Sequence, residues 1–289
     1  MRNKNLSNIA ASVKAKLLNI AKKKDVDFNN ILLRYFQERL LYRLSVSKYK
    51  TGFVLKGGLL LIVIDVPTSR PTVDIDFLAE KLKSDAKKIE SIFKEIADIG
   101  LPDGIVFNPA AITSERIKED ADYEGIRIKI TGVLGKIKQQ VQIDFGFGDV
   151  IYPAKQDIIF PSILSEDKIK LKGYPLEVVI AEKFEAMVKL GFINSRMKDF
   201  YDVYTILKNC SVDSAALKQA IKKTFHNRGI ELTAEPEVFS EKFYKDTLKL
   251  KQWSSFLKKN NLTDIPENLE KVVLEIKKIL IPIIYVDTL

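Results

Sequence analysis

The stretch "VLKGGLLLIVIDVPTSRPTVDIDFLAE", residues 54–80, combines a glycine pair, an apolar run and two closely spaced aspartates. Asp74 and Asp76 stand two residues apart in an otherwise apolar segment. A carboxylate removed from water is costly unless it is paired or binds a cation. The segment therefore raises the question of which cation, or which charged substrate, meets these two side chains.

The segment "TVDIDFLA", residues 72–79, has the pattern of a β-strand. Side chains alternate between the two faces of a strand, so Asp74 and Asp76 share one face while Ile75 and Phe77 share the other. Two like charges in this arrangement repel each other, and a hard divalent ion such as Mg²⁺ would relieve that repulsion together with substrate phosphates. Two acids of an edge strand that face water are the simpler interpretation, and the pair alone leaves it open.

Gly57 and Gly58 lie upstream of the acidic strand and precede "LLLIVIDV", which allows a short helix, followed by a loop bounded by Pro67 and Pro71. Glycine lets backbone N–H groups approach phosphate oxygens without a Cβ in the way. The helix would turn its positive end toward the same anion. A tight turn without a ligand is the alternative for the glycine pair.

A third acid stands in "QQVQIDFGFG", residues 139–148. On a strand, Asp144 shares a face with Gln140 and Gln142. A third carboxylate on a neighbouring strand would complete a metal-binding trio with the first two. Taken singly, Asp144 also fits a surface position.

Composition limits the partners and the compartment. Lys plus Arg number 47 against 38 Asp plus Glu, a net charge of +9, which favours polyanionic partners such as nucleic acid or nucleotides. Cys210 is the single cysteine, so an intramolecular disulfide and a cysteine zinc site are excluded. We expect a cytoplasmic protein without membrane association, because the N-terminus lacks a secretory apolar core and no apolar run is long enough to span a bilayer.

The first third of the chain has helical patterns. Apolar residues recur at helical spacing in "NIAASVKAKLLNIAKKK", and Asp27 is the expected N-cap of a second helix, "FNNILLRYFQERLLYRLSVS". Arg34, Arg39 and Arg43 of that helix are expected to be solvated or paired with acids, with a phosphate contact as the alternative.

The middle of the chain, from about 50 to 160, indicates a mixed α/β region around a sheet. An amphipathic helix is predicted over 82–99, and "GIVFNP", "GIRIKITGVL" and "IKQQVQIDFGFG" alternate as strands. The segments "PLEVVIAEKFEAMVKL", "SRMKDFYDVYTILKN", "SAALKQAIKKTFHNR" and "PENLEKVVLEIKKIL" then have helical periods. We therefore expect a helical C-terminal domain over 166–289, after a first domain over 1–165.

The glycine turn, the D-x-D strand and the later acid together resemble the nucleotidyltransferase superfamily typified by DNA polymerase β. In that superfamily two Mg²⁺ ions held by the acids activate an attacking hydroxyl and neutralise the triphosphate of an NTP. The chain departs from the pattern at Gly58, where the superfamily has a serine, and in a longer gap before Asp74.

The resemblance to one branch, the AbiEii/AbiGii toxin family, is closer. It covers most of residues 10–260 and is carried by "SVKAKLLNIAKKKDVDFNNILLRYFQERLLYRLSVSKYKTGFVLKGGLLL", "RPTVDIDFLAE", "PLEVVIAEKFEAMVKLGFINSRMKDFYDVYTILKN", "AIKKTFHNRGI" and "QWSSFLKKN". It implies an α+β fold, with N-terminal helices, a nucleotidyltransferase-type mixed sheet flanked by helices, and a helical C-terminal domain. It also implies the toxin of a toxin–antitoxin or abortive-infection pair, with a cognate antitoxin encoded nearby. Some relatives, the MenT toxins, transfer nucleotides to the 3′ end of tRNA.

The same resemblance gives roles to two residues of the helical half. Lys183 in "AEKFEA" matches a lysine that contacts the triphosphate, and Asp199 in the pattern "R-x-K-D-x-x-D" matches a functional acid that orients Lys183 or a base, with Asp202 as its structural helper. Without the family, Lys183 reads as a solvated lysine. The two acids then read as partners of Arg196 and Lys198 along the helix.

The sequence thus leads to one principal hypothesis. It is Mg²⁺-dependent transfer (or Mn²⁺-dependent) of NMP from an NTP to an RNA hydroxyl, with tRNA as the leading acceptor. The expected catalytic residues are Asp74, Asp76, Asp144, Lys183 and Asp199. The acids Asp74, Asp76 and Asp144 are expected to hold the metals, with Asp144 assisting or acting as base, and Gly57, Gly58, Lys183 and Asp199 to bind the nucleotide. Nucleotidylation of a protein hydroxyl and a catalytically inactive nucleotide- or RNA-binding module are the alternatives.

Overall fold

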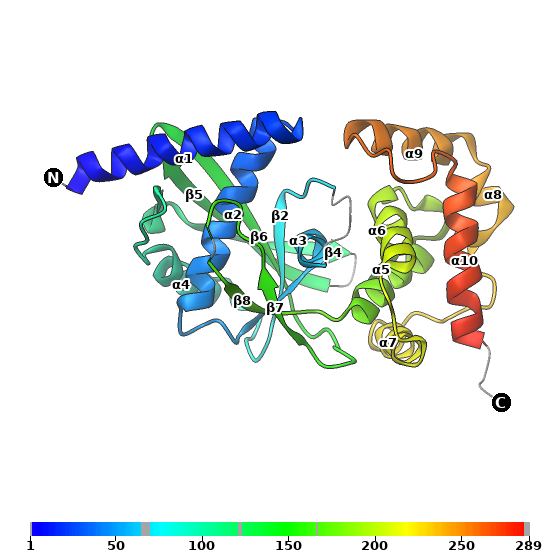
Figure 1. The fold of residues 1–289 in the computed structure, drawn as a ribbon. Coiled ribbons are helices and arrows are strands. Elements are labelled where there is room, and N and C mark those ends of the chain that lie inside the picture. Colours follow the sequence, from blue (N-terminus) through cyan, green and yellow to red (C-terminus); the bar gives the residue numbers. More distant parts are fainter. Residues whose placement is uncertain (1, 65–69, 121–122, 166, 286–289) are drawn as a thin grey trace. The chain divides into compact units, whose positions relative to one another are not determined.

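The computed structural model describes residues 2–64, 70–120, 123–165 and 167–285. Most of the predicted loop between Pro67 and Pro71 lies outside these ranges. The chain divides into two compact units, each described by itself below (Figure 1). The sheet unit comprises Met1–Val63, Pro71–Gly148 and Asp157–Gly173, and the helical unit comprises Ile64–Arg70, Asp149–Gln156 and Tyr174–Leu289.

Within the described residues, the sheet unit is built on a mixed sheet of eight strands. Their order is β3-β5-β6-β2-β1-β8-β7, and β4 pairs with β5 outside this path. The pairs β2–β6 and β1–β8 are parallel, whereas β1–β2, β3–β5, β4–β5 and β5–β6 are antiparallel. The bounds are β1 Phe53–Lys56, β2 Asp74–Ala79, β3 Ile105–Phe107, β4 Thr113–Asp120, β5 Tyr123–Leu134, β6 Ile137–Gly146, β7 Gln156–Phe160 and β8 Ile169–Gly173.

The helices of the sheet unit follow the predicted order with one shift. They are α1 Arg2–Lys24, α2 Phe28–Val46, α3 Gly57–Val63 and α4 Ala86–Ala97, with a 3-10 turn at Pro109–Ala111. Asp27 caps α2 as expected, because its carboxylate accepts a hydrogen bond from the backbone N–H of Asn29 at 2.8 Å. The helix predicted over 82–99 begins later, since Asp85 accepts from the N–H of Lys88 and so fixes the N-terminus at Ala86.

An aromatic core covers one face of the sheet. Phe77 of β2 and Phe145 of β6 are at most 1% exposed, and their ring centroids lie 6.0 Å apart. Phe53 of β1 and Phe93 of α4 complete the cluster, with centroids 5.2 to 5.5 Å from Phe145. Buried aromatic clusters of this kind contribute strongly to stability. They therefore fix which face of each strand points inward and, by alternation, which face carries the polar side chains.

The arginines of α2 are anchors of the fold. Arg39 and Arg43 are 5% and 1% exposed and bind the carboxylate of Asp103 at 2.9 and 2.7 Å. Arg34 lies over the ring of Phe160 at 4.1 Å from the ring centroid. The expectation that these arginines are solvated or paired with acids is confirmed for Arg39 and Arg43, which are buried and paired with acids. Buried guanidinium groups require such partners.

The helical unit confirms the predicted change of character along the chain. Helix α5 packs against α6 and α7, and α10 packs against the same two helices (Figure 1). Helix α9 was not predicted from periodicity. Among the described residues, no helix is long and apolar enough to cross a membrane. The bounds are α5 Leu176–Leu190, α6 Met197–Asn209, α7 Ser214–Asn227, α8 Glu241–Tyr244, α9 Thr247–Lys259 and α10 Leu269–Tyr285, with 3-10 turns at Gly191–Ile193 and Glu237–Phe239.

Candidate active site

A row of charged residues crosses four adjacent strands on the polar face of the sheet. Lys56 of β1 is the register partner of Asp76 on β2, Asp76 is the partner of Asp144 on β6, and Asp144 is the partner of Arg127 on β5. Residues directly opposite each other on paired strands project from the same face. Asp144 therefore lies on the same side of the sheet as Asp76, and we call these four residues the charged row.

Asp74 belongs to the next row on the same face. Its register partner is Gln142, which in turn lies opposite Lys129. Asp74 and Asp76 are partly exposed, whereas Ile75 between them is buried in the core. The D-x-D strand thus presents two carboxylates two residues apart, beside the third acid of the neighbouring strand.

Arg127 holds the third acid. Its Nε and one terminal nitrogen donate to the two carboxylate oxygens of Asp144 at 2.8 and 2.7 Å. This bidentate contact raises the pKa of Arg127, although partial burial opposes the charge, and the negative charges of Asp144 and Asp74 act in the same direction. Both oxygens of Asp144 are consequently engaged by one guanidinium group in this structure.

Gly57, the first residue of α3, lies in close contact with the carboxylate of Asp76. Its φ is +67°, in the left-handed region that favours glycine, and a Cβ at this position would collide with the carboxylate of Asp76. Gly58 follows as a buried residue of the same short helix. The first glycine of the pair is therefore required both by its backbone conformation and by the close approach of Asp76.

The carboxylates on the polar face of the sheet fit a hard divalent cation in part. Carboxylate oxygens are the ligands that Mg²⁺ prefers, and two of them with substrate phosphates are a common set. Asp74 and Asp76 could supply such a pair. In the part of the chain that the structure describes, however, no three His, Cys, Asp or Glu side chains form a group arranged to hold a metal. Asp144 fits as a third ligand only after Arg127 gives up at least one of its oxygens.

A second charged cluster lies in the helical unit around Lys183 of α5. Its Nζ lies 2.9 Å from Asp199 Oδ1 and 2.7 Å from Asp202 Oδ2, both on α6. Arg196 contacts the other oxygen of Asp199 at 2.7 Å, and Arg70 binds Asp202 through two nitrogens at 3.0 and 2.9 Å. We call these five residues the Lys183 network.

Burial makes the Lys183 network electrostatically strong. Asp199 and Asp202 are 0% and 1% exposed. Although burial opposes ionisation, Lys183 and Arg196 lower the pKa of Asp199 to about 2. Burial likewise opposes the charge of Lys183, yet the two carboxylates raise its pKa. Asp199 and Lys183 therefore both stay charged at neutral pH, and Lys183 is not the solvated lysine that the pattern alone allowed.

Neighbouring acids of α5 have a different partner. Arg228 binds Glu185 at 2.6 Å and approaches Glu182 and Asp149 at 3.5 Å. Asp149 also accepts from the hydroxyl of Tyr174 at 3.0 Å. Arg228 is thus paired with acids, and this cluster ties α5 to the end of α7.

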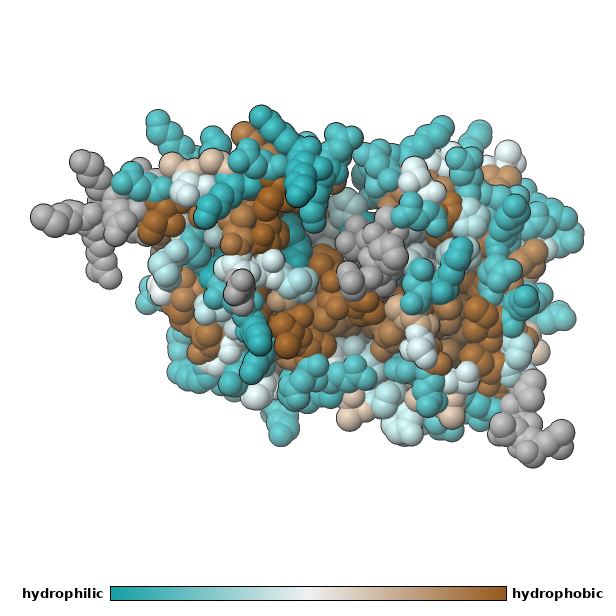
Figure 2. Space-filling view, viewed as in Figure 1, coloured by the Kyte–Doolittle hydropathy of each residue, from teal (hydrophilic) through white to brown (hydrophobic). Residues whose placement is uncertain are grey.

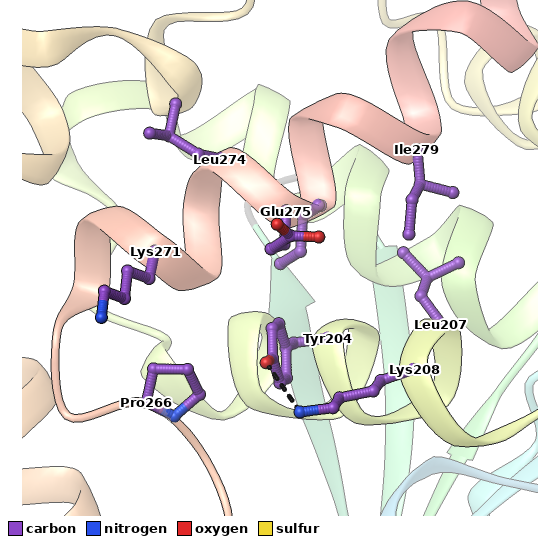
Figure 3. A pocket seen from close by; sticks show the side chains of 9 residues that line it. Tyr204, Leu207, Lys208, Pro266, Lys271, Leu274, Glu275 and Ile279 are labelled. Carbon is purple, nitrogen blue, oxygen red and sulfur yellow. Dashed lines mark hydrogen bonds between the residues drawn. The ribbon is translucent and has the colours of Figure 1, made fainter.

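Two surface hollows of the helical unit differ in lining. One has a volume of about 570 Å³ and lies between α6 and α10. Its lining includes Leu207, Leu274 and Ile279, together with Tyr204, to whose hydroxyl Lys208 donates at 3.4 Å (Figure 3). The other, of about 630 Å³, is lined by the start of α6 and one face of α9 and is rich in cations. Hydrophobic residues reach the surface near α10, and hydrophilic residues are mixed with hydrophobic ones over α9 (Figure 2). Leu274 of α10 and Leu248 and Leu250 of α9 are exposed.

The candidate site residues from the sequence lie in or beside two of these clusters. Asp74, Asp76, Asp144 and Gly57 meet on the polar face of the sheet, with Gly58 next to them in sequence, whereas Lys183 and Asp199 meet in the helical unit. The pairing of Arg196 with Asp199 was anticipated. Asp202 binds Lys183 and Arg70 instead of Lys198.

Sequence reasoning missed Lys56, Arg127 and Arg70. Arg127 alternates with Ile126 and Ile128 in a strand that was predicted, so its face could have been inferred although its partner strand could not. Lys56 ends a strand of only four residues. Arg70 has no periodic signal, because it precedes the acidic strand in irregular structure.

The fold and the charged row define the class of protein. A mixed sheet in which a D-x-D strand stands beside a strand with a third acid, next to a glycine turn, is the core of a nucleotidyltransferase. Residues 39–274 match the profile of the family described as the nucleotidyl transferase AbiEii toxin of type IV toxin–antitoxin systems, and the chain belongs to that family.

Solved structures support the fold. The crystal structure of JHP933 from Helicobacter pylori superposes with a TM-score of 0.53 at 16% identity, over 89% of this chain and 92% of that one. A candidate nucleotidyltransferase from H. pylori gives 0.51 at 17% identity, over 89% and 96%. At such identities the likeness establishes the fold alone. No curated protein matches the chain.

Proposed function

We propose that this toxin transfers a nucleoside monophosphate from an NTP to a hydroxyl of RNA, with the 3′ end of tRNA as the leading acceptor. The observation that carries the proposal is the register of β2 and β6, which aligns Asp76 with Asp144 while Gly57 closes on the carboxylate of Asp76. Family membership supports the reaction class, and the net charge of +9 supports a polyanionic acceptor.

Asp74 and Asp76 are the residues we propose to hold magnesium, or manganese in its place. A bound divalent ion would neutralise the triphosphate charge and favour ionisation of the acceptor hydroxyl. Asp144 would accept the hydroxyl proton or join the ligand set, and either role requires Arg127 to release one of its oxygens. The backbone of Gly57 and Gly58 offers a surface without Cβ atoms to the phosphates.

Lys183 and Asp199 are proposed to serve the triphosphate, as the family resemblance implies. A lysine ammonium on a flexible stem is suited to such a contact. The short bond to Asp199 would hold that ammonium in place and fully charged. The protein would act in the cytoplasm, where NTPs and tRNA are found, and would be opposed by a cognate antitoxin.

A catalytically inactive RNA- or nucleotide-binding module is the second candidate. Two observations favour it: Gly58 offers no hydroxyl where the superfamily has a serine, and Arg127 occupies both oxygens of Asp144. Such a protein would bind its ligands with magnesium and release no pyrophosphate.

The deciding experiment incubates the protein with each α-labelled NTP, total RNA and MgCl₂, and follows label in RNA, label in protein and pyrophosphate release. We expect labelled tRNA with the wild type and a loss on the order of 10²–10³-fold in Asp76→Asn, because the charge stabilisation at the reacting phosphate is removed. Asp157→Asn, which replaces an exposed strand carboxylate paired with Lys172, is the matched control and should keep full activity. Label in a protein band, or no pyrophosphate from any NTP, would refute the RNA transfer.

A further inference from the structure

The cation-rich hollow of the helical unit has the composition of an anion site. Five of its lining residues are cationic: Arg70, Arg196, Lys198, Lys251 and Lys259. No aspartate or glutamate occurs among its described lining residues. We call this hollow, of about 630 Å³, the α9 pocket.

The charge balance around the α9 pocket stays positive when the adjoining network is included. Lys183 adds a sixth cation, and Asp199 and Asp202 are the two carboxylates that meet this group. Arg70 forms an ion pair with Asp202, and Arg196 forms one with Asp199. Within the ranges that the structure describes, no ion pair engages Lys198, Lys251 or Lys259. Clustered cations without counter-ions repel one another, so a bound anion would stabilise the pocket.

Burial and neighbouring positive charges both act on the ammonium of Lys198. Desolvation lowers the pKa of Lys198, and the positive charges of Arg196, Lys183 and Arg70 act in the same direction against Asp199. Its ammonium stands in the first turn of α6, where the helix dipole is also positive. The side-chain charge and the helix dipole would therefore both attract an anion next to Lys198.

The geometry of α9 favours an extended polyanion over a single phosphate. Lys251, Ser255 and Lys259 recur at intervals of four along one face of the helix, and Gln252 lies beside Lys251. At 1.5 Å per residue, Lys251 and Lys259 start about 12 Å apart along the axis. That length exceeds one phosphate group and suits successive phosphates of an extended strand.

The pocket also offers contacts for bases. Phe256 is partly exposed in its lining, between Tyr201 and the buried Trp253, with ring centroids 5.8 Å from each. The amide oxygen of Gln252 is buried and has no hydrogen-bond partner among the described residues. An aromatic platform beside a basic groove is the usual means of holding single-stranded nucleic acid, and the amide oxygen could accept from a base amino group.

We infer that the α9 pocket binds a single-stranded segment of RNA, with its lysines on consecutive phosphates and Phe256 and Gln252 beside a base. This inference rests on the proposed function, for which the pocket would be a binding surface for the acceptor strand.

The test measures binding of a fluorescent 12-nucleotide single-stranded RNA by anisotropy, without NTP, as a function of salt. Replacing both lysines, Lys251→Gln with Lys259→Gln, should weaken binding on the order of tenfold and reduce the salt slope by about 1.4, the value for two phosphate contacts on a single strand. Lys222→Gln with Lys278→Gln removes the same charge from exposed positions of α7 and α10 and should leave affinity within about twofold.

The outcomes separate this inference from the proposed function. Asp76→Asn should lose transfer and keep RNA affinity, whereas the pocket variant should lose affinity. Equal loss in the pocket and control variants, or unchanged RNA binding in the pocket variant, would overturn the inference. So would ATP, or vesicles with anionic lipid, binding through Lys251 and Lys259 while the RNA binds elsewhere.

Discussion

The charged row and the Lys183 network both contain closely spaced acids, but they solve the electrostatic problem differently. On the polar face of the sheet, Asp76 of the charged row and Asp74 of the next row stay partly exposed, and their positions follow from strand register. In the network, two carboxylates are withdrawn from water and enclosed by three cations. The acids of the sheet remain partly exposed, whereas the buried acids of the network hold three cations in place. We therefore expect substitutions in the Lys183 network to lower mainly the stability of the fold, and substitutions of Asp74 or Asp76 to lower mainly ligand binding.

The largest difference is expected in unfolding free energy. Asp199→Ala removes one of the two carboxylates that neutralise the buried Lys183 and leaves an excess of positive charge in the network, which should cost about 3–5 kcal/mol. Asp74→Asn removes one of two neighbouring like charges on a partly exposed face, so its effect should stay within about 1 kcal/mol. Urea titration of both variants measures the contrast, and similar losses would contradict the distinction between the regions.

The second largest effect is expected from low pH, which should weaken the Lys183 network. The pKa of Asp199 is lowered from 3.8 to about 2, so its contribution is fully present above pH 4 and is lost as the pH falls toward 2. Each pKa unit corresponds to about 1.4 kcal/mol, which gives about 2–3 kcal/mol over this window. Lys183, with its raised pKa, stays protonated throughout and adds nothing to the slope.

Denaturant midpoints at pH 4, 3 and 2 measure this loss. Asp199→Asn is the comparison, because it cannot titrate and should show a shallower dependence over the same range. An equally steep dependence in that variant would assign the acid sensitivity to other carboxylates.

The contact of Gly57 with Asp76 should cost less to disturb. Gly57→Ala adds a left-handed backbone penalty and a clash with the carboxylate, together about 1–3 kcal/mol, and displaces Asp76. Gly148→Ala is the matched control in the same unit, since its φ is +77° and a Cβ there meets nothing within 4 Å. It should carry the backbone penalty alone. Thermal unfolding and the transfer assay would then separate strain from the displaced acid.

The smallest expected change concerns the third acid. Arg127→Gln removes a positive charge from Asp144 and Asp74, so Mn²⁺, read by its paramagnetic resonance signal, should bind several-fold more tightly, on the order of 1 kcal/mol. The control is Arg116→Gln on the adjacent strand, where the arginine contacts Glu124 instead. Unchanged or weaker Mn²⁺ binding in Arg127→Gln would mean that this arginine positions the acid and does not compete with metal.

Local pattern predicted much of the fold and part of the candidate site. Alternation in β2, β5 and β6 identified the polar faces, and the helical periods identified α5, α6, α7 and α10. The strands β1, β4, β7 and β8 were missed. Of these, β7 and β8 have five residues each, and the distinction between strand and loop in such short segments depends on the neighbouring strand. Pairing partners are long-range contacts that a single sequence does not encode in its periodicity.

Long-range partners also explain the missed side chains. Arg39 and Arg43 looked like surface residues because helical spacing reports a face and not what covers that face; Asp103 covers it. Arg70 lies 132 residues from Asp202, its partner. The family resemblance supplied Lys183 and Asp199 as residues, while the geometry of their network came only with the structure.

The hairpin between β5 and β6 sets the parity of the whole charged row. Leu134 pairs with Ile137 across a two-residue turn, with Gly135 at φ +60°, and the count from there places Asp144 opposite Arg127. One extra residue in this turn would send Asp144 toward the aromatic core and bring a phenylalanine to the polar face, unless a bulge absorbed it. Length changes at this turn are thus tolerable in even steps, and the chemistry of the acids depends on an odd-or-even count made eight residues away.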